Sequence, residues 1–355
     1  MKSPRAPRHA ALLIAVGLAA MCGGQARTQG QIQSQAESQT QPTPIKFALD
    51  FKFEGPAAPF LVGLDKGYYK AEGIEVTIDP GGGSIEPINR IASGGYDMGF
   101  GDINSLIKFR DQNPNADLRA IFMVYNKPPF AVIGRKSRGV EKPQDLEGKK
   151  LGAPAADGAF AQWKIFAKEA GIDATKVTID NIGLPVREPM LAAGQVDAIT
   201  GFSFSSFVNL KDRGVPVNDI VVMLMADYGV NVYGNTIIVN GKFATEKPEA
   251  VKGFLRAFVK GLKDTVREPT QAVESVLKRN EVAKKDVELE RLRMALRENI
   301  LTPEVKANGY GVVNMQRLTE SIDQIALTYE FKNKAKAAAV YDPSFLPPVH
   351  DRKAP

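Results

Sequence analysis

The residues best suited to contact a small molecule lie where expected strands end. Asp50, Phe51 and Lys52 close the first expected strand, which runs from Ile45 to Phe51. In open α/β sheets, ligands bind outside the carboxyl ends of the strands, so this carboxylate, ring and ammonium group are candidate contacts. A solvated turn is an equally good interpretation for Lys52 and a poorer one for Asp50.

Three further groups of candidates lie where expected helices begin. Two are loops that supply free backbone N–H groups to an anion or other acceptor, and the third is a capping carboxylate after a strand. Plain capping is an equal alternative for both loops. The first loop lacks the Lys-Ser/Thr pair of a P-loop, which argues against nucleotide binding. The candidates are Gly83 and Ser84, with Ser84 capping the helix that ends at Ser93; Ala155, Asp157 and Gly158, before the helix from Ala159 to Ala170; and Asp102, before the helix from Ile103 to Arg110.

Aromatic residues and one arginine complete the candidate site. Phe202 and Phe204, in an expected loop from Phe202 to Phe207, and Tyr228 and Tyr233 farther on could stack on a flat or apolar ligand, although each alone is more typical of a core. Arg187 falls in the first turn of a helix, where a cation is unfavourable unless an anion or carboxylate compensates it. We therefore include Arg187 as a ligand contact.

The region that carries the fold contains neither histidine nor cysteine. His9, His350 and Cys22 all lie outside Pro44 to Pro347. Zinc sites, Cys-His and Ser-His nucleophile pairs and disulfide bonds need these residue types, so none of them is expected there. The sequence therefore favours a binding protein without metal, cofactor or covalent chemistry over an enzyme.

A repeat at an offset of 100 residues indicates two similar lobes. Arg90 to Gly101 matches Met190 to Gly201, so that Asp97 corresponds to Asp197. In each copy an apolar helix ends at a glycine that can adopt a left-handed conformation, and a short turn leads into a buried strand. Such punctuation is also common in α/β proteins in general, but the surrounding strands and helices repeat in the same order. We assign residues 44–127 and 237–347 to lobe 1, 128–236 to lobe 2 and 348–355 to a tail, with the C-terminal helices packed on lobe 1.

The first 43 residues have a different character. Lys2, Arg5 and Arg8 precede an apolar run from Ala10 to Met21, which is too short to span a bilayer and is typical of a secretory signal. We expect residues 1–26 to be a signal peptide and 27–43 a flexible polar linker. A lipid anchor at Cys22 is the less favoured alternative. Without these residues the formal net charge falls from +6 to +3, which removes the support for a nucleic-acid partner.

Four stretches resemble a known family. LDFKFEGPAAPFLVGLDKGYYKAEGIEV (49–76), KPQDLEGKKLGAP (142–154), NIGLPVREPMLAAGQVDAITGF (181–202) and ADYGVNVYGNTIIV (226–239) are similar to type II periplasmic solute-binding proteins of the nitrate, taurine and sulfonate group. Within that group they most resemble the thiamine-pyrimidine-precursor proteins. The resemblance implies two Rossmann-like lobes joined by two crossover strands, a ligand in the cleft, a periplasmic location, and delivery to an ABC permease and its ATPase.

The chain departs from the family pattern at three places. Phe51 stands where a Trp is usual, Pro56-Ala57 replaces an Asn-His pair, and Ser206 replaces a carboxylate. These departures weaken the assignment of a pyrimidine ligand, because a partner for the exocyclic N–H groups is missing. We expect a monomeric importer component for a small solute containing nitrogen or sulfur, either aromatic or anionic.

Two alternatives remain. One is binding or synthesis of the thiamine pyrimidine; the resemblance implies that synthases use clustered His and Cys for iron, which this region lacks. The other is a sensor partner that reports the ligand to a membrane receptor.

Export has a direct test. The protein purified from its native host should begin after Ala26, or at a modified Cys22, because the leader combines basic residues with a short apolar run. Mass spectrometry of the intact protein measures this. Recovery of the chain with Met1 to Ala26 attached would contradict the prediction.

Overall fold

The computed structural model describes residues 41–355, which form one compact unit with two five-stranded sheets. The predicted signal peptide and most of the predicted linker lie outside the described residues. The first sheet has the spatial order β2 (Ile74–Asp79), β1 (Thr43–Ala48), β3 (Met98–Asp102), β10 (Asn235–Asn240) and β4 (Leu118–Met123). The second has the order β7 (Thr178–Asp180), β6 (Lys150–Gly152), β8 (Ala198–Phe202), β5 (Phe130–Arg135) and β9 (Ile220–Leu224).

The two sheets have the same topology. In the first, β1 is parallel to β2 and β3, and β10 runs antiparallel between β3 and β4. In the second, β6 is parallel to β7 and β8, and β5 runs antiparallel between β8 and β9. Each antiparallel strand is contributed by the part of the chain that has just crossed from the other sheet. The first sheet and its helices are called lobe 1 below, and the second sheet and its helices lobe 2.

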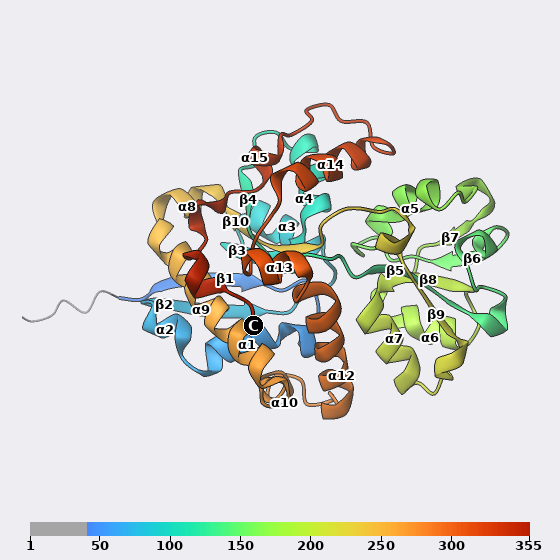
Figure 1. Ribbon diagram of the computed structural model, residues 1–355, viewed down its shortest axis with the longest axis horizontal. Coiled ribbons are helices and arrows are strands. Elements are labelled where there is room, and N and C mark those ends of the chain that lie inside the picture. The colour runs from blue at the N-terminus through green and yellow to red at the C-terminus, as the bar shows by residue number, and fades with distance from the viewer. Residues whose placement is uncertain (1–40) are drawn as a thin grey trace, which may run out of the picture. The chain divides into compact units, whose positions relative to one another are not determined.

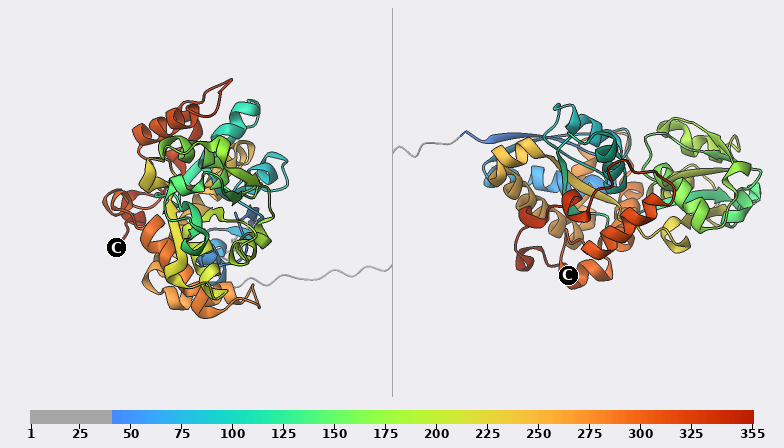
Figure 2. Two further views of the ribbon diagram at one scale, coloured as in Figure 1. Left: turned by 90° about the vertical axis from the view of Figure 1, so that its right-hand side faces the viewer. Right: turned by 90° about the horizontal axis from the view of Figure 1, so that it is seen from above.

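Helices cover both sheets. Lobe 2 carries α5 (Trp163–Glu169), α6 (Arg187–Ala192) and α7 (Ser203–Asp212). The other helices are α1 (Ala58–Asp65), α2 (Tyr68–Ala71), α3 (Glu86–Ala92), α4 (Ile103–Gln112), α8 (Gly241–Glu246), α9 (Pro248–Arg267), α10 (Pro269–Ala272), α11 (Glu274–Leu277), α12 (Lys285–Ala295), α13 (Pro303–Asn308), α14 (Met315–Ala326) and α15 (Ala337–Val340). In Figures 1 and 2 the green segment forms lobe 2, while the orange and red C-terminal helices gather around lobe 1.

The C-terminal helices pack on lobe 1, as predicted. Phe254 on α9 stacks on Phe47 of β1 with ring centroids 4.9 Å apart, and Phe258 lies 4.4 Å from Phe60 of α1. These rings are buried in one continuous core, and burial of large aromatic side chains is a major source of folding free energy. No helix of residues 41–355 combines the length and the apolar composition that a membrane crossing requires.

The repeat at an offset of 100 is confirmed in detail. Gly94 and Gly194 end their helices with φ of 77° and 71°. Asp97 accepts a hydrogen bond from the Lys46 backbone N–H at 2.8 Å, and Asp197 accepts one from the Lys150 N–H at 3.0 Å. The helices that follow, α4 and α7, start and end at residues that are 100 apart. The two lobes are therefore built on the same local unit.

Three local expectations were wrong. Phe202 to Phe207 is not a loop, because Ser203 begins α7 and its apolar side chains pack into the lobe cores. Ser84 caps no helix: α3 begins at Glu86, and no side chain bonds its N-terminus. Strand β9 has no counterpart among the expected elements.

The paired aspartates make the repeat testable. We expect Asp97→Ala and Asp197→Ala each to lower the free energy of unfolding by about 1 kcal/mol, since each removes a carboxylate acceptor from a backbone N–H of the neighbouring strand. Urea unfolding measures this. Asp97→Asn and Asp197→Asn retain an acceptor and serve as controls with smaller losses. A loss at one site with none at the other would show that the two turns are not equivalent.

Candidate functional site

A pocket lies between the two lobes at the carboxyl ends of β1 and β8. Its empty volume is about 520 Å³, a figure that includes space open to solvent. Lobe 1 supplies Asp50, Phe51, Lys52, Glu54, Pro56, Ala57, Gly83 and Ser84, the connection after β4 supplies Tyr125, and lobe 2 supplies Asp157, Leu184, Arg187, Phe202, Phe204 and Ser205. A ligand in this pocket would therefore touch both lobes.

Three aromatic rings form a wall of the pocket. Phe202 ends β8 and Phe204 lies in the first turn of α7, so the strand-to-helix junction places both rings at the pocket. Tyr125, in the connection that follows β4, meets them edge to face, with its ring centroid 6.2 Å from that of Phe202 and 5.9 Å from that of Phe204. Such rings offer a planar ligand stacking and edge contacts.

Two carboxylates from the loop after β1 also line the pocket. Asp50 accepts a hydrogen bond from Asn235 Nδ2 at 2.9 Å, but burial raises its pKa from the ordinary 3.8 to about 7. Burial also raises the pKa of Glu54, although Arg291 Nε lies 3.4 Å from Glu54 Oε2 and opposes this effect. Asp50 therefore changes charge near neutral pH.

Arg187 is neutralised within the protein. Its Nε and one terminal nitrogen donate to Glu188 Oε1 at 2.9 Å and 2.7 Å, and its other terminal nitrogen lies 3.6 Å from Asp157 Oδ2. Burial alone would lower the pKa of Arg187, but these two carboxylates raise it. The cation at this helix start is compensated by protein carboxylates, so it has little charge left for an anionic ligand.

Beside the pocket the lobes are in close contact through glycines. Gly83 has φ of +130°, and a Cβ atom there would lie 2.4 Å from the carbonyl oxygen of Ala156 in lobe 2. A Cβ on Gly158 would lie 3.1 Å from Ser84 Oγ. Side chains at Gly83 would hold the lobes apart, so glycine is needed there for this closed arrangement.

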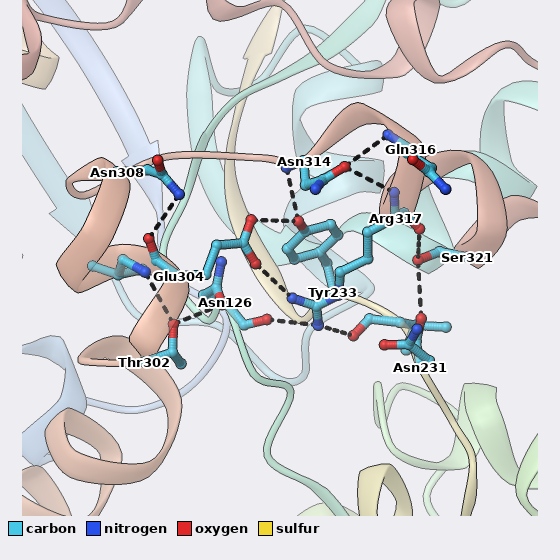
Figure 3. Close-up of polar contacts among 12 residues, drawn as sticks. Asn126, Asn231, Tyr233, Thr302, Glu304, Asn308, Asn314, Gln316, Arg317 and Ser321 are labelled. Atoms are coloured by element: carbon cyan, nitrogen blue, oxygen red, sulfur yellow. Dashed lines mark hydrogen bonds and ion pairs between the residues drawn. The ribbon is translucent and has the colours of Figure 1, made fainter.

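The two connections between the lobes are joined by Arg317 of α14. The connections are residues 124–129 and 229–234. Arg317 Nη2 donates to a carbonyl oxygen in each, that of Asn126 and that of Val232, both at 3.0 Å. Arg317 Nη1 lies 3.0 Å from Glu304 Oε2, and the guanidinium stacks 3.9 Å from the centroid of the Tyr233 ring (Figure 3). One side chain thus fixes the spacing of both connections.

The structure brings nine of the fourteen predicted contacts together. These are Asp50, Phe51, Lys52, Gly83, Ser84, Asp157, Arg187, Phe202 and Phe204. Ser84 is positioned by a loop rather than by capping, and its Oγ accepts from Asn235 Nδ2 at 3.3 Å.

The other five predicted contacts lie outside the pocket. Asp102 is buried and caps α4 through the N–H groups of Asn104 and Ser105. Tyr233, in connection 229–234, donates to Glu304 Oε1 and accepts from the Asn314 N–H, and Tyr228 packs edge-on against Phe166 of α5. The remaining two belong to the loop before α5: Ala155 is exposed on a different groove, and Gly158 is buried against Ser84.

Several pocket residues were not predicted from the sequence, and three of them carry polar groups: Glu54, Tyr125 and Ser205. Glu54 stands four residues after Asp50 in the same loop, and that proximity was the available signal. Ser205 follows Phe204 within the expected aromatic loop. Tyr125 had no local signal, because it lies in a connection between lobes. Among residues 41–355, no group of three or more His, Cys, Asp or Glu side chains is arranged to hold a metal ion.

Curated relatives bind or synthesise ring compounds. The riboflavin-binding protein RibY of Chloroflexus aurantiacus is 29% identical over 219 residues, which are 61% of this chain and 60% of that protein. A formylaminopyrimidine-binding protein of Halalkalibacterium halodurans is 24% identical, over 74% of this chain and 79% of its own. A 4-amino-5-hydroxymethyl-2-methylpyrimidine phosphate synthase of Schizosaccharomyces pombe is 25% identical, over 64% and 67%. The match thus spans about 60% of the length of the riboflavin-binding relative.

A solved structure and a family model complete the comparison. The alkanesulfonate-binding protein SsuA of Xanthomonas axonopodis pv. citri superposes with a TM-score of 0.65 at 13% identity, covering 85% of this chain and 99% of that one. This likeness shows the periplasmic binding protein fold, as predicted. The family model described as NMT1/THI5 like matches residues 56–272, more than half of the chain. The chain therefore belongs to the NMT1/THI5-like family.

Proposed function

We propose that this protein is the solute-binding component of an ABC importer and that its ligand is a planar nitrogen heterocycle with N–H donors. The observation that carries the proposal is the polarity of the pocket: Asp50 and Glu54 line it as acceptors, while Arg187 is occupied by Glu188 and Asp157. Carboxylates accept hydrogen bonds from ring and exocyclic N–H groups. The three-ring wall suits a flat ligand.

The charge balance argues against an anionic ligand. Of the two cations that line the pocket, Arg187 is paired with protein carboxylates, and Lys52 is exposed. A sulfonate or nitrate would be placed beside Asp50 and Glu54, where like charges repel. The carboxylates also replace the acceptor that the sequence comparison found missing at Ser206, so an aminopyrimidine or a flavin is the favoured class. The names of the riboflavin- and formylaminopyrimidine-binding relatives support the same class.

Binding is favoured over synthesis by the residues available. The resemblance implies clustered His and Cys in the synthases, but His350 is the only histidine and there is no cysteine in residues 41–355. The His350 side chain is 76% exposed and lies outside the pocket. We therefore propose export, ligand capture and presentation to a permease.

A ligand screen tests this function. We expect 4-amino-5-hydroxymethyl-2-methylpyrimidine or riboflavin to raise the melting temperature, because a ligand at one hundred times its Kd adds about 2.7 kcal/mol of apparent stability. Alkanesulfonates and nitrate should have no effect. Small-angle scattering should show a more compact protein with the best ligand, since the pocket draws on both lobes. Stabilisation by a sulfonate alone would overturn the assigned ligand class.

Because the pKa of Asp50 is raised, we expect the substitution Asp50→Asn to change stability and ligand binding in opposite directions. Between about pH 4 and pH 7 the folded protein holds a proton on Asp50 that the unfolded chain releases, so this group lowers the free energy of unfolding as the pH rises through that range. Asp50→Asn should therefore be more stable than the unmodified protein at pH 8, but not at pH 4, and should bind the ligand at least tenfold more weakly.

Urea unfolding across this pH range and calorimetric titration measure the two effects. Asp323→Asn is the control, because Asp323 is an exposed carboxylate paired with Lys334 at the surface. It should leave both the pH profile and the affinity unchanged. An Asp50→Asn protein that loses stability at pH 8 would show that the Asp50 carboxylate is stabilising rather than costly.

A further inference from the structure

Glu54, which was not among the contacts predicted from the sequence, is held in place by helix α12. Arg291 of α12 is 1% exposed, and its Nε lies 3.4 Å from Glu54 Oε2. This Nε makes no hydrogen bond within the described residues, so its attraction to Glu54 is ionic. A buried guanidinium without a carboxylate nearby would be strongly unfavourable. The pairing therefore keeps the Glu54 side chain next to Arg291 at the edge of the pocket.

The backbone of the same loop is fixed by α12 as well. Glu288 Oε2 accepts from the Gly55 N–H at 2.7 Å and also pairs with Arg291. A Cβ atom on Gly55 would lie 2.2 Å from the Glu288 carbonyl oxygen, so the loop touches the helix directly. Both the side chain and the backbone at Glu54 thus depend on α12, and the carboxylate has little freedom to move.

Lobe 2 reaches this pair through one helix. Arg291 Nη2 donates to Asn209 Oδ1 at 2.6 Å, and Ser205 Oγ donates to Glu54 Oε2 at 3.4 Å. Ser205 and Asn209 are four residues apart on α7 and so share a face of that helix. The first turn of α7 also carries Phe204, part of the aromatic wall. The Glu54–Arg291 pair therefore contacts α7, the helix that carries Phe204 of the aromatic wall.

Other contacts between α7 and α12 are weaker. Lys211 pairs with Glu290, and Lys284, just before α12, pairs with Asp212, each at 2.8 Å, but all four side chains are partly exposed to solvent. Exposed ion pairs contribute little and are screened by salt. The buried Arg291 contact is thus the polar link between the lobes that also reaches the pocket.

We infer that Arg291 is a positioning residue for ligand selection: it holds the Glu54 carboxylate as an acceptor for a ligand N–H group and joins that carboxylate to lobe 2 through Asn209. The inference rests on the proposed function for the class of ligand. It adds that one carboxylate is involved in both ligand recognition and lobe closure. A ligand that lacks an N–H donor toward Glu54 would leave this group unpaired and would be rejected.

The groups around Glu54 make its charge depend on Arg291. Glu54 faces Arg291 and Glu288 from α12, Arg187 and Glu188 from α6, and Asp50 and Lys52 from its own loop. Burial and the two glutamates raise its pKa, and Arg291 is the strongest influence that lowers it. Without Arg291 the carboxyl group would hold its proton to higher pH and would become a donor.

Four variants test the inference: Glu54→Gln, Arg291→Met, Arg291→Lys and the double variant of the first two. The probes are 4-amino-5-hydroxymethyl-2-methylpyrimidine and riboflavin, titrated by calorimetry from pH 6 to pH 9. We expect Glu54→Gln and Arg291→Met each to weaken binding at least tenfold and the double variant to be no weaker than either, because both changes remove the same acceptor. Arg291→Lys should recover part of the affinity.

The pH profile separates positioning from general damage. Arg291→Met should lose most affinity at low pH, where Glu54 is protonated, and regain part of it as the pH rises. Glu54→Gln should recover less, because it keeps only the titration of Asp50, which both variants share. Arg256→Met removes a partly exposed arginine of α9 that pairs with Glu72, the residue after α2, and neither residue lines the pocket; this variant is the control and should bind as the unmodified protein does. Additive losses in the double variant, or unchanged binding in Arg291→Met, would overturn the inference.

Unfolding without ligand provides an independent readout. If Glu54 and Arg291 interact, the shift in urea midpoint of the double variant should differ from the sum of the shifts of the two single variants. Asn209→Ala is a further variant for the case in which Arg291→Met does not fold; it should weaken binding severalfold and reduce the compaction caused by the ligand. If the unmodified protein binds neither probe, the proposed function fails while the unfolding cycle still decides whether Arg291 positions Glu54. If it binds a probe and the cycle is additive, only the inference fails.

Discussion

The geometry of the pocket depends on how two backbone connections are held side by side. Arg317 donates to a carbonyl oxygen in each connection, and Glu304 and the Tyr233 ring hold its guanidinium in place. Because both lobes attach through these connections, their spacing determines where the strand ends of one lobe meet those of the other. The C-terminal helices lie outside both sheets, yet through α14 they determine the relative position of the two halves of the pocket.

Buried charge is the second constraint. Arg187 and Arg291 are withdrawn from water, and each is paired with carboxylates of its own lobe. These pairs use the strong cations near the pocket and leave Asp50 with a pKa of about 7. A site of this kind is costly to stability when empty, because an acceptor is held in a poorly hydrated place. A ligand with N–H donors offsets that cost by pairing with the carboxylate. The site therefore selects its ligand by hydrogen-bonding groups as well as by shape.

The sequence predicts local structure better than long-range pairing. The start of α4 at Ile103 was predicted to the residue, since an aspartate cap is a local signal. The prediction of a loop from Phe202 to Phe207 was wrong. It rested on the alternation of Phe and Ser, although the repeat already indicated a helix there, because a helix was expected at the equivalent residues of lobe 1. Arg317 binds a carbonyl 191 residues away, and no spacing along the chain reveals such a contact.

The repeat also explains why the two lobes contribute unequally to the pocket. Asp102, Asn104 and Ser105 stand 100 residues before Phe202, Phe204 and Ser205, at the same junction of strand and helix. In lobe 1 these side chains are bound internally: Asp102 caps α4, and Asn104 donates to the carbonyl oxygen of Tyr233 in a connection between the lobes. In lobe 2 the equivalent α7 has no side-chain cap, and its residues face the pocket instead. The same backbone unit therefore anchors a connection in one lobe and forms the aromatic wall in the other. Phe202 lines the pocket and Asp102 lies outside it because the backbone is duplicated whereas its side chains have different partners.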